Sequence, residues 1–372
     1  MFRLTARLRP HARLLAQRRI STFNMDNSVR GRLQPLMTGI KVVSGIAGLV
    51  ALGSAGFYLY INHHLDTNWP ASPLITNPAT RKLLRGAALR EHLAPNAPIA
   101  YLFLLRALEQ IQQDGELPEE SPEVQELVVR LASAARAAGE TAAAEQLLKR
   151  AWAMVVDGQG RAICAPVVVG AVTVRYPEQW RDRQIGQIAD QLGPLLTGQG
   201  RAAEAVRVFG AALQAAKRQE ENDEDAMLLR QANLVTSLGE AFALHGDVDS
   251  ARALFESALV DVQKRAGDGP WACLDAVLMY NLAQISAQAE KRAWANSALS
   301  VVRKQRDVRA CLNCETHVVR LLGGMAELQG DLAEAKKLYD KSLELARRSG
   351  TGNIELTREA AERVAHKMLI DE

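Results

Sequence analysis

The fold is decided by three stretches that align without a gap: LGPLLTGQGRAAEAVRVFGAAL (192–213), LGEAFALHGDVDSARALFESAL (238–259) and LGGMAELQGDLAEAKKLYDKSL (322–343). Each begins with Leu-Gly and has a second Gly seven residues after the first. An Ala follows five residues later, and an aromatic residue four positions beyond that Ala. A block that repeats in this way predicts an array of stacked helical units rather than one globular core.

Each shared position has a physical role in a pair of antiparallel helices. The first Gly lets the two helices touch, and the second permits the tight turn between them. The Ala keeps the second helix close to the first, and the aromatic ring is expected to fill the gap against the following pair. In that order of role, the residues are Gly193, Gly239 and Gly323; Gly200, Gly246 and Gly330; Ala205, Ala251 and Ala335; and Phe209, Phe255 and Tyr339. This is the tetratricopeptide pattern.

Weaker copies fill the gaps between these stretches. The copy near Glu290 lacks the turn glycine, and residues 158–177 are expected to form an irregular insertion. The sequence therefore predicts an all-α, tetratricopeptide-like α-solenoid over residues 81–353, followed by a capping helix over residues 354–372. The alanines expected at helix–helix contacts are Ala100, Ala144, Ala205, Ala251, Ala295 and Ala335.

The chain begins with two segments of a different character. Residues 1–23 contain six Arg and no acid, which is typical of a mitochondrial transit peptide. Residues 42–61 carry no charge and would span about 30 Å as a helix, so we expect a transmembrane helix in the lipid bilayer. Small residues that would let a second membrane helix pack closely are Ser44, Ala47, Gly48, Ala51 and Ala55.

The charges beside the expected membrane helix predict its orientation. Residues 24–41 hold Arg30, Arg32 and Lys41, whereas no Lys or Arg follows the helix until Arg81. Positive flanks stay on the side from which a helix is inserted, so residues 24–41 are expected in the matrix. The linker over residues 62–80 and the repeat array would then lie in the intermembrane space of the mitochondrion.

Composition and motifs argue against several functions. The net charge of +3 hides nine basic residues and one acid in the first 41 residues, with 36 basic and 41 acidic residues after them. The body is therefore mildly acidic, and nucleic acid is not an expected partner. The sequence has no P-loop, no GxSxG motif, no HExxH motif and no dinucleotide fingerprint. We expect no catalytic residue, no cofactor and no metal.

A cysteine pair is the one chemical motif in the array. Cys311 and Cys314, followed by His317, are interpreted first as buried small residues, with a redox or disulfide role and a metal site as the two alternatives. Cys164 and Cys273 are interpreted as ordinary core positions.

A binding groove is more plausible than an active site. The first helices of a tetratricopeptide array line one surface on which protein segments bind. Counted from the repeat register, the residues of that surface are Asp190, Asn233, Glu240, Tyr280, Arg320 and Glu327.

The order of these segments resembles one known family. CLNCETHVVRLLGGMAELQGDLAEAKKLYDKSLELARRSG (311–350) and TRKLLRGAALREHL (80–93) are similar to the C-terminal part and the opening helix of the fungal tetratricopeptide adaptors of the mitochondrial inner-membrane i-AAA protease. The resemblance covers most of residues 36–372 and is weak over 155–185. It implies a non-catalytic subunit that binds the AAA protease, a second membrane adaptor, or both, and presents unfolded protein substrates. Alanine richness and the missing turn glycine depart from the family.

Three other functions are open at this point. One is an assembly or maintenance factor for a respiratory-chain complex, because the chain also resembles the metazoan tetratricopeptide protein that maintains complex III. An import receptor of the outer membrane is another, although such an anchor would not normally follow a cleaved presequence. The third is an enzyme that uses Cys311 and Cys314 as a redox pair.

Overall fold

The described residues of the computed structural model belong to two units, which divide between Pro70 and Ala71. We call the second, which begins at Ala71, the repeat unit. The described residues are 57–115, 117–157, 163, 167–169, 172–174, 178–219, 224–265, 271, 273–305, 308–350 and 354–371.

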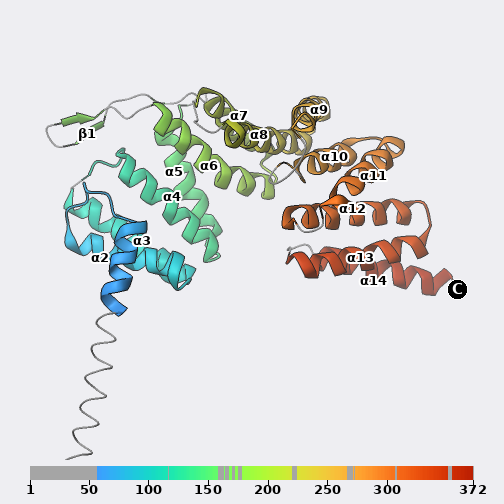
Figure 1. The fold of residues 1–372 in the computed structure, drawn as a ribbon, viewed down its shortest axis with the longest axis horizontal. Coiled ribbons are helices and arrows are strands. Elements are labelled where there is room, and N and C mark those ends of the chain that lie inside the picture. Colours follow the sequence, from blue (N-terminus) through green and yellow to red (C-terminus); the bar gives the residue numbers. More distant parts are fainter. Residues whose placement is uncertain are drawn as a thin grey trace, which may run out of the picture. The chain divides into compact units, whose positions relative to one another are not determined.

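The repeat unit is built almost entirely of helices (Figure 1). Its helices are α2 (Pro78–Ala88), with the π-helical turn η2 (Leu89–Leu93), α3 (Ala97–Asp114), α4 (Pro122–Ala137), α5 (Thr141–Val155), α6 (Glu178–Gly198), α7 (Ala202–Arg218), α8 (Glu224–His245), α9 (Val248–Gln263), α10 (Leu274–Ile285), α11 (Gln288–Lys304), α12 (Arg309–Leu328), α13 (Leu332–Ser349) and α14 (Ile354–Asp371).

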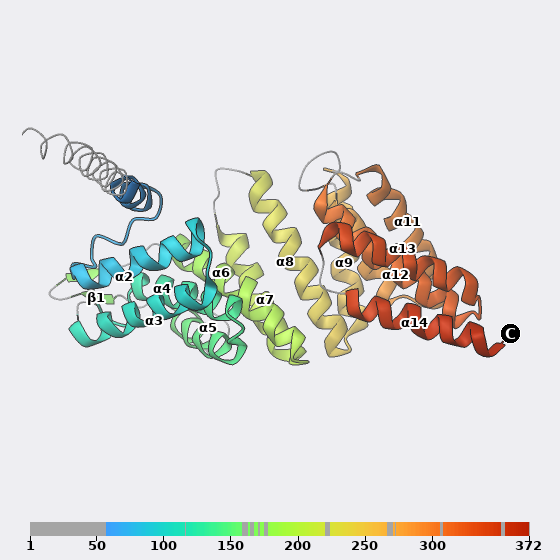
Figure 2. The ribbon, with the colours of Figure 1, turned by 90° about the horizontal axis from the view of Figure 1, so that it is seen from below.

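Consecutive helices pair into hairpins, and each hairpin packs on the next (Figures 1 and 2). The hairpins are α2–α3, α4–α5, α6–α7, α8–α9, α10–α11 and α12–α13, and α14 packs on the last of them. The six alanines expected at helix contacts all lie in second helices and are buried. The prediction of an all-α solenoid is therefore confirmed for the described part of the array.

Glycine and aromatic positions hold the hairpins closed. A Cβ atom at Gly193 would lie 2.2 Å from Cζ of Phe209, and one at Gly239 would lie 2.4 Å from Cε1 of Phe255. Each ring thus lies on the glycine of its own hairpin, and it also belongs to a core cluster with residues of the following helix, as expected. A ring seated over a glycine brings the two helices together where any larger residue would separate them.

The helix ends follow local rules. The glycines at four hairpin turns, Gly139, Gly200, Gly246 and Gly330, have positive φ angles between 74° and 93°. Asp247 and Asp331 cap α9 and α13 by accepting hydrogen bonds from the backbone N–H groups of Ser250 and Glu334. Between α10 and α11 the chain turns at Ser286 and Ala287 with ordinary negative φ, so this hairpin closes without a glycine.

The expected insertion contains a short antiparallel β-hairpin. Strands β1 (Val167–Val169) and β2 (Val172–Val174) pair between α5 and α6, with Val168 opposite Thr173. The all-α prediction omits this hairpin. Its five Val residues and one Thr are β-branched and favour extended backbone, which explains why a strand pair forms here.

Most of the N-terminal predictions lie outside the described residues. These include residues 1–23, residues 24–41 and most of the predicted membrane helix, with its small residues Ser44, Ala47, Gly48, Ala51 and Ala55. Residues 57–68 form a helix that overlaps the expected linker over 62–80, and the first proline of that linker is Pro70, beyond the end of the helix. No helix in the described part of the chain is long and apolar enough to cross a bilayer.

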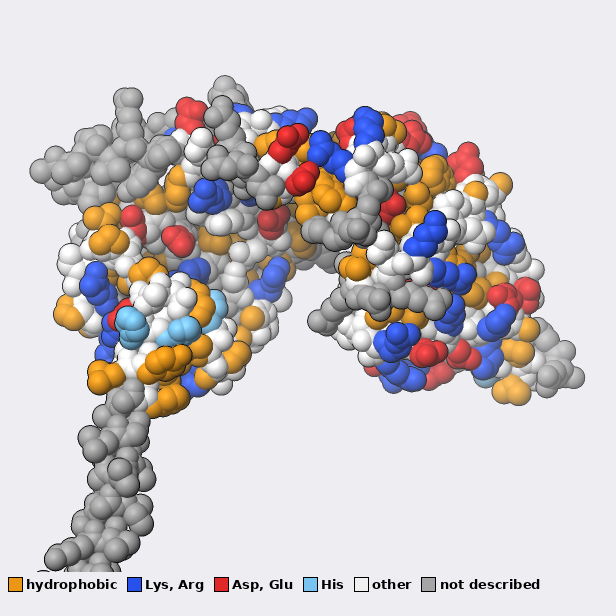
Figure 3. All heavy atoms as spheres, viewed as in Figure 1, with side chains coloured by type: hydrophobic (Ala, Val, Ile, Leu, Met, Phe, Trp, Pro, Cys, Tyr) orange, Lys and Arg blue, Asp and Glu red, His pale blue; other side chains and the backbone are white. Residues whose placement is uncertain are grey.

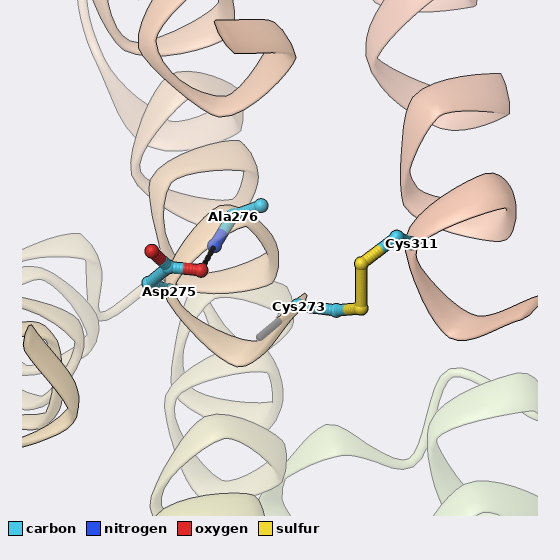
Figure 4. The surroundings of a disulfide bond; sticks show 4 residues. All are labelled: Cys273, Asp275, Ala276 and Cys311. Atoms are coloured by element: carbon cyan, nitrogen blue, oxygen red, sulfur yellow. Dashed lines mark hydrogen bonds between the residues drawn. A yellow bond between two sulfur atoms is a disulfide. The ribbon is translucent and has the colours of Figure 1, made fainter. Parts of the chain in front are cut away.

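A disulfide bond connects two neighbouring hairpins (Figure 4). Cys273, directly before α10, is bonded to Cys311 of α12, with 5.0 Å between their Cα atoms. Cys314 is free and buried, and Cys164 lies outside the described residues. The interpretation of Cys273 as an ordinary core residue is therefore wrong. The sequence shows only that Cys311 and Cys314 share a helical face, whereas packing of α10 against α12 brings Cys273 to that face.

Candidate functional site

The first helices of the hairpins, together with α14, form a surface that we call the first-helix face. Polar contacts connect neighbouring helices along it. Ser133 of α4 donates to Gln191 of α6 over 2.7 Å, and Asn281 of α10 donates to Glu240 of α8 over 2.8 Å. These contacts fix the neighbouring first helices to one another in addition to the apolar core beneath them.

Five of the six residues predicted for this face take part in such contacts. Asp190 interacts electrostatically with Arg230 of α8, and Tyr280 with Arg320 of α12. Glu240 accepts from Asn281, and Glu327 accepts from Arg363. The sixth, Asn233, is exposed on α8. The structure does not gather all six at one site, because they extend over four successive first helices.

Three of the six, Tyr280, Arg320 and Glu327, line one pocket. Its volume is about 630 Å³, and its walls come from α10, the start of α11, α12, α13 and α14. We call it the α10–α14 pocket. Its other main polar residues are Gln284, Gln288, Lys291, Tyr339, Glu359, Arg363 and Lys367, and its main apolar residues are Leu321, Met325, Leu328, Leu356 and Ala360.

Glu327 is the centre of a charge cluster at one end of the pocket. Its carboxylate accepts hydrogen bonds from Arg363 at 2.9 Å, from Lys367 at 2.9 Å and from the hydroxyl of Tyr339 at 3.0 Å. The hydrogen bond from Arg363 is the main cause that lowers the pKa of Glu327 to about 2. Burial, and then the bond to Glu327, raises the pKa of Tyr339 to about 12. Glu327 is thus ionised, and its carboxylate is already hydrogen-bonded to the neighbouring side chains.

Another cation that lines the pocket, Arg320, has no acidic partner among the described residues. Arg320 is half-buried beside Tyr280, and the ring of His317 lies 6.0 Å from that of Tyr280. Burial lowers the pKa of His317, and the charge of Arg320 lowers it further, so the imidazole is neutral at pH 7. Burial raises the pKa of the Tyr280 phenol, although Arg320 opposes that shift. This end of the pocket is therefore positive and can bind an anionic group.

Several residues of this pocket were missed from the sequence. Lys291 reaches it from the first turns of α11, and Arg363 and Lys367 reach it from α14, the expected capping helix. Their spacing of four residues puts Arg363 and Lys367 on one face of a helix, which is the signal that could have indicated them. Their partner Glu327 is 36 and 40 residues away in sequence, so the pairing follows only from the fold.

A larger hollow of about 710 Å³ lies between α5, α6 and α7. Trp152, Leu192 and Leu196 are among its lining residues, and none of the predicted groove residues lines it. Among the residues that the structure describes, no group of three or more His, Cys, Asp and Glu is placed to hold a metal ion. The α10–α14 pocket is therefore the candidate site.

No known family model matches the sequence, and no curated protein matches it. Three solved structures have similar helical arrangements. A tetratricopeptide repeat protein from Parabacteroides merdae has a TM-score of 0.45 and 11% identity, with 78% of this chain and 100% of that chain covered. The apo form of RapI has a TM-score of 0.46 and 11% identity, with coverages of 75% and 95%. BtubC from P. vanneervenii has a TM-score of 0.42 and 15% identity, with coverages of 74% and 92%. At these values the similarity carries no statement about function.

Proposed function

We propose that this chain is a non-catalytic adaptor of the mitochondrial inner membrane that binds protein segments on its first-helix face. The observation that carries the proposal is the α10–α14 pocket, in which three residues predicted from the repeat register line one hollow. Among the described residues, first helices and α14 contribute most of the lining of this pocket, and surfaces of stacked hairpins suit extended or helical segments of a partner.

The cellular role follows from the N-terminal sequence. A basic segment over 1–23 and an uncharged segment over 42–61 support import into mitochondria and one membrane span, with the repeat unit in the intermembrane space. An anchored binding face raises the effective concentration of its clients near other membrane proteins. Together with the resemblance to the adaptor family, this supports recruitment of unfolded substrates to an inner-membrane AAA protease.

Affinity purification from detergent-solubilised mitochondria tests this role. The tagged full chain should co-purify with an AAA protease and with short-lived client proteins, as identified by mass spectrometry. Subunits of a respiratory-chain complex as the dominant partners would instead establish the assembly-factor alternative. A chain with residues 42–61 replaced by a different uncharged membrane segment keeps its anchor, and it separates partners bound by the repeat unit from partners bound within the bilayer.

Protease protection of mitoplasts tests the orientation. With the outer membrane ruptured, added protease should digest the repeat unit and leave only a short N-terminal fragment protected. If the repeat unit stays intact until the inner membrane is also dissolved, it lies in the matrix and the proposed meeting with clients in the intermembrane space is wrong.

A further inference from the structure

The charges that line the α10–α14 pocket do not balance. Four cations, Lys291, Arg320, Arg363 and Lys367, face two acids, Glu327 and Glu359. Arg363 and Lys367 share the carboxylate of Glu327. Within the described residues, Lys291 and Arg320 have no acid within 4 Å. A recessed wall with an excess of positive charge concentrates field lines and attracts anionic groups.

Arg320 gains most from a bound anion. It is half-buried and interacts electrostatically with Tyr280 and His317. A desolvated cation is costly unless a counter-charge accompanies it, and a guanidinium prefers a planar carboxylate that accepts two hydrogen bonds. Among the described residues no carboxylate lies within 4 Å of Arg320, so a carboxylate of a ligand can fill this role.

Apolar side chains on the rim define the second half of the ligand. Leu328 and Leu356 line the pocket, although 82% and 56% of their surface is exposed. Leu321 and Met325 continue the apolar surface into the hollow. Figure 3 shows Lys and Arg side chains beside hydrophobic ones over the last helices of the repeat unit. An occupant that satisfies both features presents a carboxylate and an aliphatic or aromatic side chain within one or two helical turns.

We infer that the α10–α14 pocket binds an acidic segment of a partner protein in which Asp or Glu lies beside Leu, Met or Phe, with Arg320 and Lys291 holding the carboxylates and Leu328 and Leu356 holding the apolar side chain. This inference rests on the proposed binding role of the first-helix face and adds the chemistry of the bound segment.

An anionic membrane surface fits the pocket less well. Binding to a flat layer of headgroups requires protruding cations, whereas Arg320 is recessed in a hollow of about 630 Å³ that also contains two acids. Those acids would repel a continuous anionic surface. They would tolerate a short segment, because its carboxylates contact Lys291 and Arg320 and not the two acids.

Peptide binding to the full chain in detergent micelles tests the inference by fluorescence anisotropy. The probe is a labelled peptide of about 14 residues with Glu and Leu at helical spacing, and the comparison peptide has Gln in place of every Glu. We expect the Glu peptide to bind at least tenfold more tightly than the Gln peptide at about 0.1 M salt, and to weaken as salt rises. Equal binding of the two peptides overturns the inference.

Two pairs of substitutions locate the binding. Lys291→Gln with Arg320→Gln should weaken the Glu peptide at least tenfold, because two charge-assisted contacts are lost. The matched control is Arg183→Gln with Lys304→Gln, which removes two exposed cations that do not line the pocket and should leave affinity within about twofold. Equal losses in both pairs would show that only net charge matters.

A charge reversal gives a gain of binding that an unfolded variant cannot produce. The variant with both Lys291→Glu and Arg320→Glu should no longer bind the Glu peptide. It should instead bind a peptide that has Lys in place of every Glu. Phosphatidylcholine vesicles that contain an anionic phospholipid form the other arm. Vesicle binding that the Gln pair abolishes, with no peptide binding, would assign the pocket to lipid. If neither probe binds but the chain still co-purifies with a protease, the adaptor function stands and the acidic-segment inference alone fails.

Discussion

Hairpins α8–α9 and α12–α13 share one sequence pattern but differ in what their aromatic ring does. Phe255 lies on Gly239 and is fully buried, so its role is to hold two helices together. Tyr339 lies on Gly323 and extends further, because its hydroxyl donates to Glu327 in the α10–α14 pocket. The same repeat position is thus purely structural in one hairpin and joins the core to the candidate site in the other.

The acids of the two hairpins differ in the same way. Burial raises the pKa of Glu240 on α8, while the hydrogen bond from Asn281 only partly opposes the shift. Arg363 lowers the pKa of Glu327 on α12 to about 2. The repeat register places both acids on the first-helix face, but the neighbouring helix decides which of them is stabilised as an anion. The position of each acid on its helix is therefore a local property of the sequence, whereas its charge state depends on the side chains of the helix packed beside it.

Removing the structural ring should have the largest effect. Phe255→Ala is expected to reduce the free energy of unfolding by about 3–5 kcal/mol, because it leaves a cavity over Gly239. Urea unfolding of the full chain in micelles, followed by circular dichroism, measures the loss. Tyr339→Phe is the contrasting change, since it keeps the ring and removes only the hydrogen bond to Glu327. It should reduce the free energy of unfolding by about 0.5–1.5 kcal/mol. Equal losses in the two variants would contradict the division of roles.

Removing the disulfide should have the second-largest effect, and it should affect the α10–α14 region more than α8–α9. Cys273 and Cys311 are 38 residues apart, and opening a loop of that length is expected to cost about 2–4 kcal/mol. In Cys273→Ser with Cys311→Ser, limited proteolysis should cut the α10–α14 region first and leave α8–α9 protected. Cys314→Ser keeps the bond and serves as the control. Uniform digestion of the whole array would mean that the bond does not act on this region in particular.

The glycines offer a finer test of ring packing. Gly239→Ala should destabilise by about 1–3 kcal/mol, because the new Cβ would lie 2.4 Å from the Phe255 ring. Gly323→Ala should cost less, since its Cβ would lie 3.1 Å from Tyr339. The control is Gly210→Ala within α7, where a new Cβ would have no neighbour within 4 Å. There the higher helix propensity of Ala should increase the stability by about 1 kcal/mol or less. The thermal midpoint should be lowest for Gly239→Ala, higher for Gly323→Ala and highest for Gly210→Ala; this ranking would confirm the geometry.

The smallest effect is the pH dependence of the Glu327 cluster. The folded pKa of about 2 lies below the ordinary value of 4.5, so the stabilisation is complete above pH 4.5 and is lost as pH falls towards 2. It amounts to about 1 kcal/mol, because Arg363 and Lys367 are half exposed and screened by solvent. Glu327→Gln should lose it at pH 7 and match the parent near pH 2. Exposed Glu359→Gln, in the same pocket, should unfold like the parent throughout this range.

The sequence was sufficient for the fold because repeat signals are local. Turn glycines, anchoring alanines and cap residues act within one hairpin, so Gly246, Ala251 and Asp247 can be assigned without knowing any distant contact. The β-hairpin over 167–174 was missed because its β-branched run is short and lies in a long connection between helices.

The site was only partly predictable for the opposite reason. Repeat register placed Tyr280, Arg320 and Glu327 on first helices, and in the structure all three line one pocket. Nothing in the sequence indicates that Arg363 reaches Glu327 or that Cys273 pairs with Cys311, because the partners are 36 and 38 residues apart. Charge balance in the pocket depends on the contact of Arg363 with Glu327, so the proposed chemistry of the ligand emerged only from the structure.

Site-specific photo-crosslinking in intact mitochondria tests most directly whether the α10–α14 pocket is a protein-binding site. A photoreactive amino acid replaces Leu328 on the pocket rim, and in a matched chain it replaces Leu244, which is similarly exposed on α8 and does not line the pocket. We expect discrete crosslinked protein partners from position 328 that are absent from position 244 and that disappear when Lys291 and Arg320 are changed to Gln. No crosslinked protein from position 328, or the same set from both positions, would contradict it.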